Sequence, residues 1–89
     1  MDVAKALIDR GFHPPTVHWP LPDCFTIEPT ETESKATIES FAAALLEIAE
    51  QAKTDPTALK EAPQHAPVRR VDEIAAARNP ILTWKPDAT

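Results

Sequence analysis

Four side chains of the types that bind metals or act as nucleophiles occur in the chain, namely His13, His18, Cys24 and His65. Zinc sites usually combine two closely spaced pairs of ligands, and these four residues do not form two such pairs, so we predict no metal site. Cys24 lies in a predicted strand, where a structural cysteine explains it equally well. A Cys–His nucleophilic site is therefore not supported.

Three carboxylates, Glu28, Glu31 and Glu33, lie close together in the chain and could in principle transfer protons. Helix capping and surface solvation explain them without any catalytic role. The chain has ten prolines and only one glycine, which excludes glycine-rich phosphate loops. The residues alone therefore predict no catalytic site.

The charge balance indicates which partners to expect. Nine basic and fourteen acidic residues give a net charge of -5, which argues against nucleic acid or an anionic membrane as the partner. The pair Arg69 and Arg70 is too short for a phosphate-binding patch. With one cysteine and no apolar run of membrane-spanning length, we expect a soluble protein of the cytoplasm or an equivalent reducing compartment.

The stretch around residues 25–33 organises the predicted fold. Phe25 and Ile27 alternate with polar residues, as in a half-buried strand that ends at Pro29. Thr30 and Glu33 have the spacing of a capping box, which predicts a helix from about Glu31. A second strand at residues 16–19, separated from one at 24–28 by the turn-rich residues 20–23, predicts an antiparallel pair.

Two helices are predicted to cover one face of this pair. The first runs from about residue 3 to Arg10, because Gly11 fits a left-handed C-terminal residue with Phe12 as its apolar contact. This helix has no N-cap, which suggests a piece cut from a longer chain; a frayed natural N-terminus is the alternative. The long helix has an apolar stripe, expected in the core with a partner-binding groove as the alternative, and an acidic outer face. The stripe comprises Ile38, Phe41, Ala42, Leu45, Ile48, Ala49 and Ala52, and the outer face Glu39, Ala43, Glu47 and Glu50.

The composition changes after Ala62. Asp55 and Pro56 predict a further helical turn at residues 57–61, and prolines then interrupt a tail with one short helix at 72–78. The apolar run at 81–84 has no core of its own. We therefore expect an α+β domain at residues 1–62, with a small antiparallel sheet covered by helices on one face. Residues 63–89 would form a Pro-rich tail that packs on another domain or subunit.

Several motifs together resemble one family. Residues 11–16 (Gly-Phe-His-Pro-Pro-Thr), 19–21 (Trp-Pro-Leu) and 27–33 (Ile-Glu-Pro-Thr-Glu-Thr-Glu) resemble the C-terminal region of the glycine-decarboxylating P-protein of the glycine cleavage system. Residues 60–63, 67–73, 77–80 and 82–84 of the tail resemble the end of its subunit 2 type. The resemblance thus covers essentially the whole chain, although the turn at residues 18–24 departs from the family pattern.

The resemblance implies the C-terminal small domain of a fold type I pyridoxal-phosphate enzyme. Such an enzyme decarboxylates glycine on the cofactor and passes the aminomethyl group to the lipoyl arm of the H-protein. The Schiff-base lysine lies upstream of the matched region, and none of the five lysines here occurs in its motif. We therefore expect this fragment to be non-catalytic and to bind no cofactor, with the large domain, subunit 1 and the H-protein as the parent's partners.

The resemblance also gives candidate residues that line the active-site cleft or contact another subunit. They are His13, Thr16, Glu28, Thr30, Arg69, Arg70 and Trp84. Strand-edge and capping roles explain several of these residues as well. A free-standing interaction module, which binds another protein through the acidic helix and the apolar tail, is the alternative function, and the fragment could also self-associate.

Overall fold

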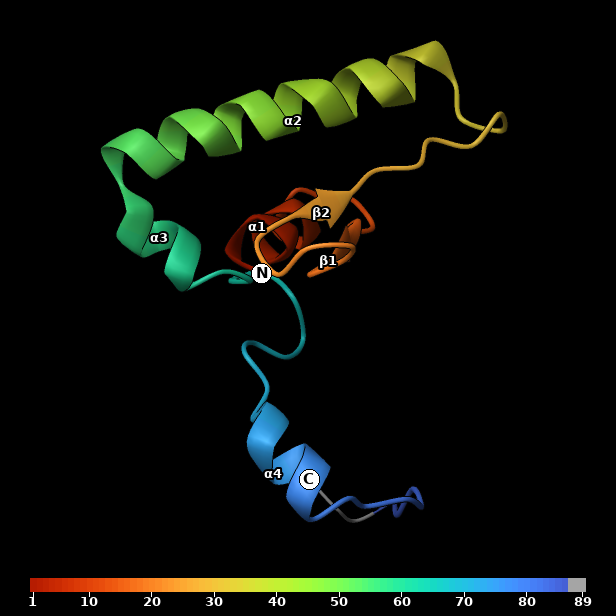
Figure 1. The fold of residues 1–89 in the computed structure, drawn as a ribbon, viewed down its shortest axis with the longest axis vertical. Helices are drawn as coiled ribbons and strands as arrows, with labels where there is room; N and C mark the ends of the chain where they lie inside the picture. Colours follow the sequence, from red (N-terminus) through yellow and green to blue (C-terminus); the bar gives the residue numbers. More distant parts are fainter. Residues whose placement is uncertain (87–89) are drawn as a thin grey trace.

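The computed structural model describes residues 1–86, as helices joined to one two-stranded sheet (Figure 1). The elements in chain order are α1 (Asp2–Asp9), β1 (Thr16–Val17), β2 (Phe25–Thr26), α2 (Lys35–Thr54), α3 (Pro56–Lys60) and α4 (Glu73–Arg78). The strands are antiparallel, with Thr16 opposite Thr26 and Val17 opposite Phe25. The α+β class predicted from the sequence is confirmed. Residues 87–89, the end of the predicted tail, lie outside the described residues.

The end of α1 is a Schellman turn, as the sequence predicts. Gly11 has φ of 83°, the left-handed conformation that costs glycine little. The N–H of Gly11 donates to the carbonyl of Ile8 at 3.0 Å, and that of Phe12 donates to the carbonyl of Leu7 at 3.0 Å. This turn directs Phe12 back onto the helical core, where it packs against the buried cluster.

The hairpin is shorter than predicted. The strands cover two residues each, in place of 16–19 and 24–28, although their antiparallel pairing is confirmed. His18 turns away with φ of 60°, and Pro20 has no N–H to continue the ladder. Side chains then hold the turn: the Thr26 hydroxyl donates to the carbonyl of Trp19 at 2.9 Å, and the Cys24 thiol donates to that of Leu21 at 3.1 Å.

The predicted capping box at Thr30 and Glu33 is wrong. Helix α2 begins at Lys35, and its N-cap is Ser34, whose hydroxyl accepts from the N–H of Thr37 at 3.1 Å. Serine is among the best N-cap residues, so Ser34 competes effectively with the site four residues earlier. The N–H of Glu33 donates to the carbonyl of Thr30 in a turn, which leaves residues 30–33 outside the helix.

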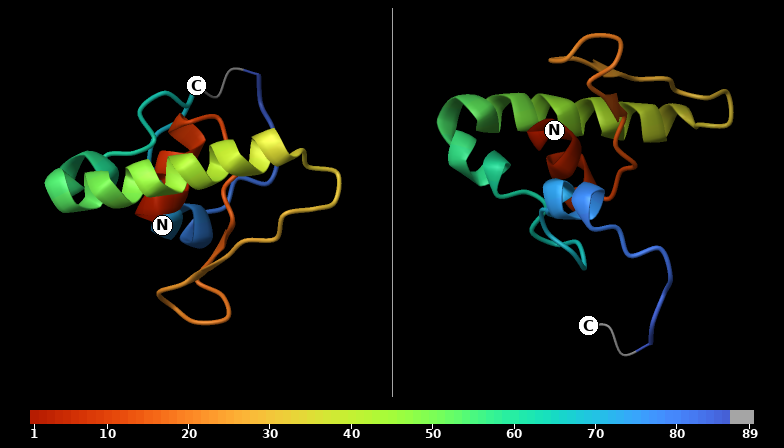
Figure 2. Two further views of the ribbon diagram at one scale, coloured as in Figure 1. Left: turned by 90° about the horizontal axis from the view of Figure 1, so that it is seen from above. Right: turned by 60° about the horizontal axis from the view of Figure 1, so that its bottom comes forward.

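The core lies among α1, α2 and α3, which contact one another (Figure 2). Its buried members are Ala6, Leu7, Ala44, Ile48, Leu59 and Ala62, with Val3, Phe12, Phe41 and Leu45 packed against them. The predicted stripe of α2 is therefore only partly confirmed: Ile48 is buried, but Ile38, Ala42, Ala49 and Ala52 are exposed. Ala44 is buried although it was not in the stripe. The predicted outer face, which includes Glu39 and Glu47, is exposed as expected.

Polar contacts reinforce these helix packings. Arg10 donates to the side-chain carbonyl of Gln51 at 3.3 Å and pairs with Glu47 at 3.5 Å, which links the end of α1 to the C-terminal half of α2. Helix α3 begins as predicted: the Asp55 carboxylate accepts from the N–H of Ala58 at 3.3 Å, and Pro56 occupies the first turn. The described helices include none long and apolar enough to cross a membrane.

Residues 63–70 are tied to the helices by hydrogen bonds. The Asp9 carboxylate accepts from the backbone N–H groups of Gln64, at 2.7 Å, and His65, at 2.8 Å. Arg70 pairs with Asp2 at 2.8 Å and also donates to the carbonyls of Leu59 and Ala62. Arg69 donates to the carbonyl of Glu61 at 2.8 Å. The two arginines thus hold the segment after α3 against α1 and α3.

Beyond Arg70 the chain leaves the helical core (Figure 1). The short helix predicted at residues 72–78 is present as α4, with Asp72 as N-cap and its carboxylate accepting from the N–H of Ala75 at 2.9 Å. Helix α4 has no buried residue. The run that follows is almost bare: Ile81, Leu82 and Trp84 are 82%, 88% and 84% exposed.

The core predicts that alanine substitutions at two apolar residues of α2 will change the free energy of unfolding by very different amounts. Ile48 is 1% exposed and Leu46 is 70% exposed. Ile48→Ala should lower the free energy of unfolding by about 2 to 5 kcal/mol, because it leaves a cavity between α1, α2 and α3. Leu46→Ala should change it by less than about 0.5 kcal/mol. Urea unfolding followed by circular dichroism measures both, and equal losses would contradict this core.

Asp9 predicts a pH dependence of stability. Burial raises the pKa of this carboxyl, but the N–H groups of His65 and Gln64, with the charges of His65 and Arg10, outweigh burial and leave the pKa below its ordinary value. Because the pKa of Asp9 is lower in the folded chain, ionised Asp9 stabilises the fold at pH values above its unfolded-state pKa of about 3.9. This stabilisation is lost as the pH falls through the folded-state pKa. Asp9→Asn should therefore lose stability less steeply below about pH 4 than wild type. Asp23→Asn, in the hairpin turn, is the control, and identical acid slopes for wild type and Asp9→Asn would refute the role.

Candidate functional site

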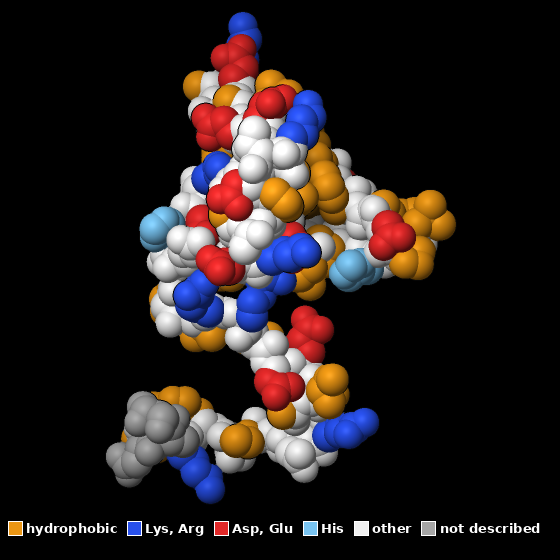
Figure 3. Space-filling model, turned by 90° about the vertical axis from the view of Figure 1, so that its left-hand side faces the viewer, with side chains coloured by type: hydrophobic (Ala, Val, Ile, Leu, Met, Phe, Trp, Pro, Cys, Tyr) orange, Lys and Arg blue, Asp and Glu red, His pale blue; other side chains and the backbone are white. Residues whose placement is uncertain are grey.

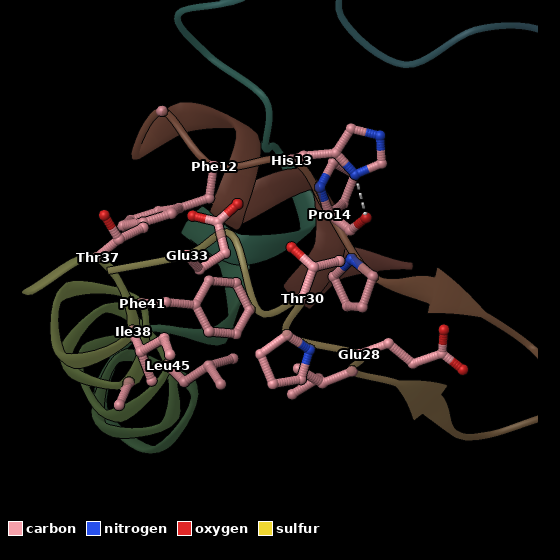
Figure 4. A pocket seen from close by; sticks show the side chains of 15 residues that line it. Phe12, His13, Pro14, Glu28, Thr30, Glu33, Thr37, Ile38, Phe41 and Leu45 are labelled. Atoms are coloured by element: carbon pink, nitrogen blue, oxygen red, sulfur yellow. Dashed lines mark hydrogen bonds between the residues drawn. The ribbon is translucent and has the colours of Figure 1, made fainter. Parts of the chain in front are cut away.

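An open groove of about 610 Å³ lies between the hairpin side of the domain and the N-terminal half of α2. Three stretches line it: the turn after α1, the segment between β2 and α2, and one face of α2 (Figure 4). The lining residues are Gly11, Phe12, His13, Pro14, Pro15, Ile27, Glu28, Pro29, Thr30, Glu33, Thr37, Ile38, Phe41, Ala42 and Leu45. The volume lies in the range of about 300 to 1,000 Å³ that is typical of ligand pockets.

The inner end of the groove is apolar and fixed by an aromatic contact. The rings of Phe12 and Phe41 meet edge to face, with centroids 5.4 Å apart and planes at 82°. Ile38 and Leu45 lie beside Phe41 on the same face of α2 (Figure 4). Because Phe12 and Phe41 also pack against the buried cluster, the groove floor is continuous with the core.

The polar groups of the groove lie on its rim. His13 Nδ1 lies 2.8 Å from the carbonyl of Pro14, and the hydroxyls of Thr30 and Thr32 are 2.7 Å apart. Both charged side chains of fixed sign in the lining, Glu28 and Glu33, are acidic, and no lysine or arginine lines the groove. The arrangement suits an apolar group with a neutral or cationic end, and offers no cation to hold a phosphate.

The structure brings three of the predicted site residues together and separates the others. His13, Glu28 and Thr30 all line the groove, although they come from two different connecting segments. Thr16 lies on β1, outside the groove lining. Arg69 and Arg70 hold the end of α3, and Trp84 is exposed on the tail.

Sequence reasoning missed the groove's α2 wall. The core was the favoured assignment for Phe41 and Leu45, with a partner-binding groove as the alternative, whereas each is half-buried and faces both the core and the groove. Ile38 is exposed and lines the groove only. The signal that could have found this wall is the length of α2, because a 20-residue helix extends past a partner helix of 8 residues.

The residues with metal-binding or nucleophilic side chains have local structural contacts. The Cys24 thiol contacts Leu21, and the His18 ring contacts the carbonyl of Pro22, both within the hairpin turn. His65 contributes its backbone N–H to Asp9. Among residues 1–86, no three histidine, cysteine or acidic side chains come together in an arrangement that could hold a metal ion.

Comparison of the sequence with those of known proteins identifies its family. Residues 1–70 match the family described as glycine dehydrogenase, C-terminal domain. The probable glycine dehydrogenase (decarboxylating) subunit 2 of Caldanaerobacter subterraneus is 57% identical over 86 residues, which cover 94% of this chain. The proteins of the same name from Methylococcus capsulatus and Nitrosococcus oceani are each 52% identical, over 99% and 96% of this chain.

The chain spans only about 18% of the length of each of these curated relatives. The matched region ends at residue 70, where Arg70 makes its contacts with Asp2 and α3. The family and the packed part of the structure therefore coincide. The chain belongs to the family of glycine dehydrogenase C-terminal domains.

Proposed function

We propose that this chain is the C-terminal domain of the glycine-decarboxylating subunit 2 of a glycine cleavage system, acting in the cytoplasm. The single observation that carries this proposal is the match of residues 1–70 to the glycine dehydrogenase C-terminal domain family. The groove gathers His13, Glu28 and Thr30 on one face of that domain. In such an enzyme glycine would be decarboxylated on pyridoxal phosphate, and the aminomethyl group would pass to the lipoyl arm of the H-protein.

The residues of this chain do not fit a complete pyridoxal-phosphate site. None of its lysines lines the groove: Lys35 and Lys53 pair with Glu39 and Glu50 on the outside of α2. No arginine lines the groove either, so it supplies no cation for the cofactor's phosphate. The Schiff-base lysine and the phosphate-binding groups must come from the rest of subunit 2 or from subunit 1.

The domain's own contribution would be one wall of the active-site cleft. The apolar floor around Phe41 and Leu45 excludes water from whatever faces it, while the Thr30 hydroxyl and the His13 ring offer hydrogen-bonding groups at the rim. Pro14, Pro15 and Pro29 restrict the backbone of the rim segments, so these polar groups are held in a narrow range of positions.

A free-standing interaction module is the second candidate function. The exposure of Ile81, Leu82 and Trp84, with the acidic outer face of α2, favours this alternative. An interaction module would bind a protein without any contribution to glycine decarboxylation. The experiment with the full-length relative below separates the two functions.

The first prediction concerns the chain alone. It should form no imine with pyridoxal phosphate at stoichiometric cofactor, because no lysine lies in its groove. Absorbance spectroscopy detects the imine band, and borohydride reduction followed by mass spectrometry reports any lysine trapped. A stoichiometric adduct on one of the five lysines would contradict the proposed division of labour.

The second prediction uses a chimera in which this sequence replaces the matching segment of the Caldanaerobacter subunit 2. Assayed with subunit 1 and H-protein, the chimera should release carbon dioxide from glycine. Thr30→Val in the chimera should lower kcat/KM by about tenfold or more, as loss of a positioned polar group typically does. Thr16→Val, the same change outside the groove, should lower it less than about twofold.

Two outcomes would contradict the proposed function. A chimera that assembles with subunit 1 but releases no carbon dioxide would favour the interaction module. Equal effects of Thr30→Val and Thr16→Val would show that the groove is not part of the cleft. Thermal unfolding of each chimera verifies that lost activity does not reflect lost folding.

A further inference from the structure

Two exposed apolar surfaces of this chain carry charges of opposite sign and could cover each other. One is the groove, with its apolar floor and two acidic lining residues, Glu28 and Glu33; the carboxylate of Glu28 points away from Phe41 and Leu45 (Figure 4). The other is the tail segment 78–86, which carries three nearly bare apolar side chains between Arg78 and Lys85. The space-filling view shows hydrophobic side chains along this tail, below the helical core (Figure 3).

We propose that the tail segment 78–86 of one copy of this chain docks in the groove of a second copy. Leu82 and Trp84 would cover the floor formed by Ile38, Phe41 and Leu45, and Lys85 would approach the acidic rim. Contiguous bare apolar surface is unfavourable in water, and large aromatic side chains are the usual anchors of protein contacts.

The charge and the position of segment 78–86 favour it as the segment that docks in the groove. The fixed charges of the groove lining are both negative, whereas those of segment 78–86 are both positive, Arg78 and Lys85. Segment 78–86 therefore matches the groove in both charge and apolar character. In Figure 1, α4 and the segment after it lie on the opposite side of the helical core from α2, which forms one wall of the groove. A tail that points away from its own groove is placed to reach another molecule.

This contact and the proposed enzymatic role use the same groove, so the two exclude each other in one molecule. In an assembled subunit the rest of the enzyme and the tail would compete for the same groove. The tail would therefore dock only when the rest of the enzyme does not occupy the groove. The two segments would exchange reciprocally, each copy supplying one tail and one groove, as in a closed two-fold dimer.

A synthetic peptide of residues 78–86 with a fluorescent label is the probe for the groove. Fluorescence anisotropy should show saturable binding to the chain, with a Kd that rises with salt because part of the attraction is between charges. The protein variant Ile38→Asp should weaken binding by about tenfold or more, since it places a charge in the apolar floor. Leu46→Asp, on the same helix but outside the groove, is the matched control and should leave the Kd unchanged.

Two further variants test the anchors. The peptide with Trp84→Ser should bind about tenfold or more weakly, as expected when a hot-spot aromatic is removed. Glu33→Gln in the protein should reduce the salt dependence, whereas Glu39→Gln, which pairs with Lys35 outside the groove, should not. Circular dichroism verifies that each protein variant is folded.

Sedimentation of the whole chain completes the test. The wild type should shift from monomer to dimer as concentration rises, and the Trp84→Ser chain should remain monomeric. No saturable peptide binding, equal binding to Ile38→Asp and Leu46→Asp, or a wild-type chain that is monomeric at every concentration would each overturn the proposal.

Discussion

The packing of Leu7 on α1, Ile48 on α2 and Leu59 on α3 is the interaction on which this small structure depends. Helix α1 has 8 residues and α3 has 5, and isolated helices shorter than about 12 to 15 residues are marginal in water. Helices α1 and α3 therefore persist because each buries an apolar residue in the core that they form with α2. The polar contacts around Arg10, Asp9 and Arg70 fix the orientation of helices that this core already holds together.

The groove follows from the same core. The Schellman turn at Gly11 sends Phe12 back onto α2, where it meets Phe41, and the chain then leaves along the rim as His13, Pro14 and Pro15. The second rim arises because residues 30–33 form a turn ahead of Ser34 instead of joining the helix. A helix that began at Glu31 would have removed part of the space, so the position of the N-cap determines the shape of the groove.

Local signals in the sequence were sufficient for some elements and insufficient for others. Gly11 predicted the C-terminal end of α1 and Asp55 the start of α3, because each acts through backbone groups a few residues away. The N-cap was misplaced because Thr30 and Glu33 have capping-box spacing, whereas Ser34, a residue type preferred over threonine at this position, caps α2. The burial of Ala44 and the exposure of Ile38 depend on where α1 and α3 cross α2, which periodicity along one helix does not reveal. The family motifs gave His13, Glu28 and Thr30 as candidates, but their meeting in one groove required the three-dimensional structure.

The ion pair between Asp2 and Arg70 has a mechanical consequence. It joins the first helical residue to the last residue of the family match, 2.8 Å apart, so the incoming and outgoing chain directions share one edge of the domain. A polypeptide attached ahead of Asp2 would enter where the chain departs after Arg70. Neither residue lines the groove. Chain connections at this edge therefore begin outside the groove, and the grooved face stays clear of them.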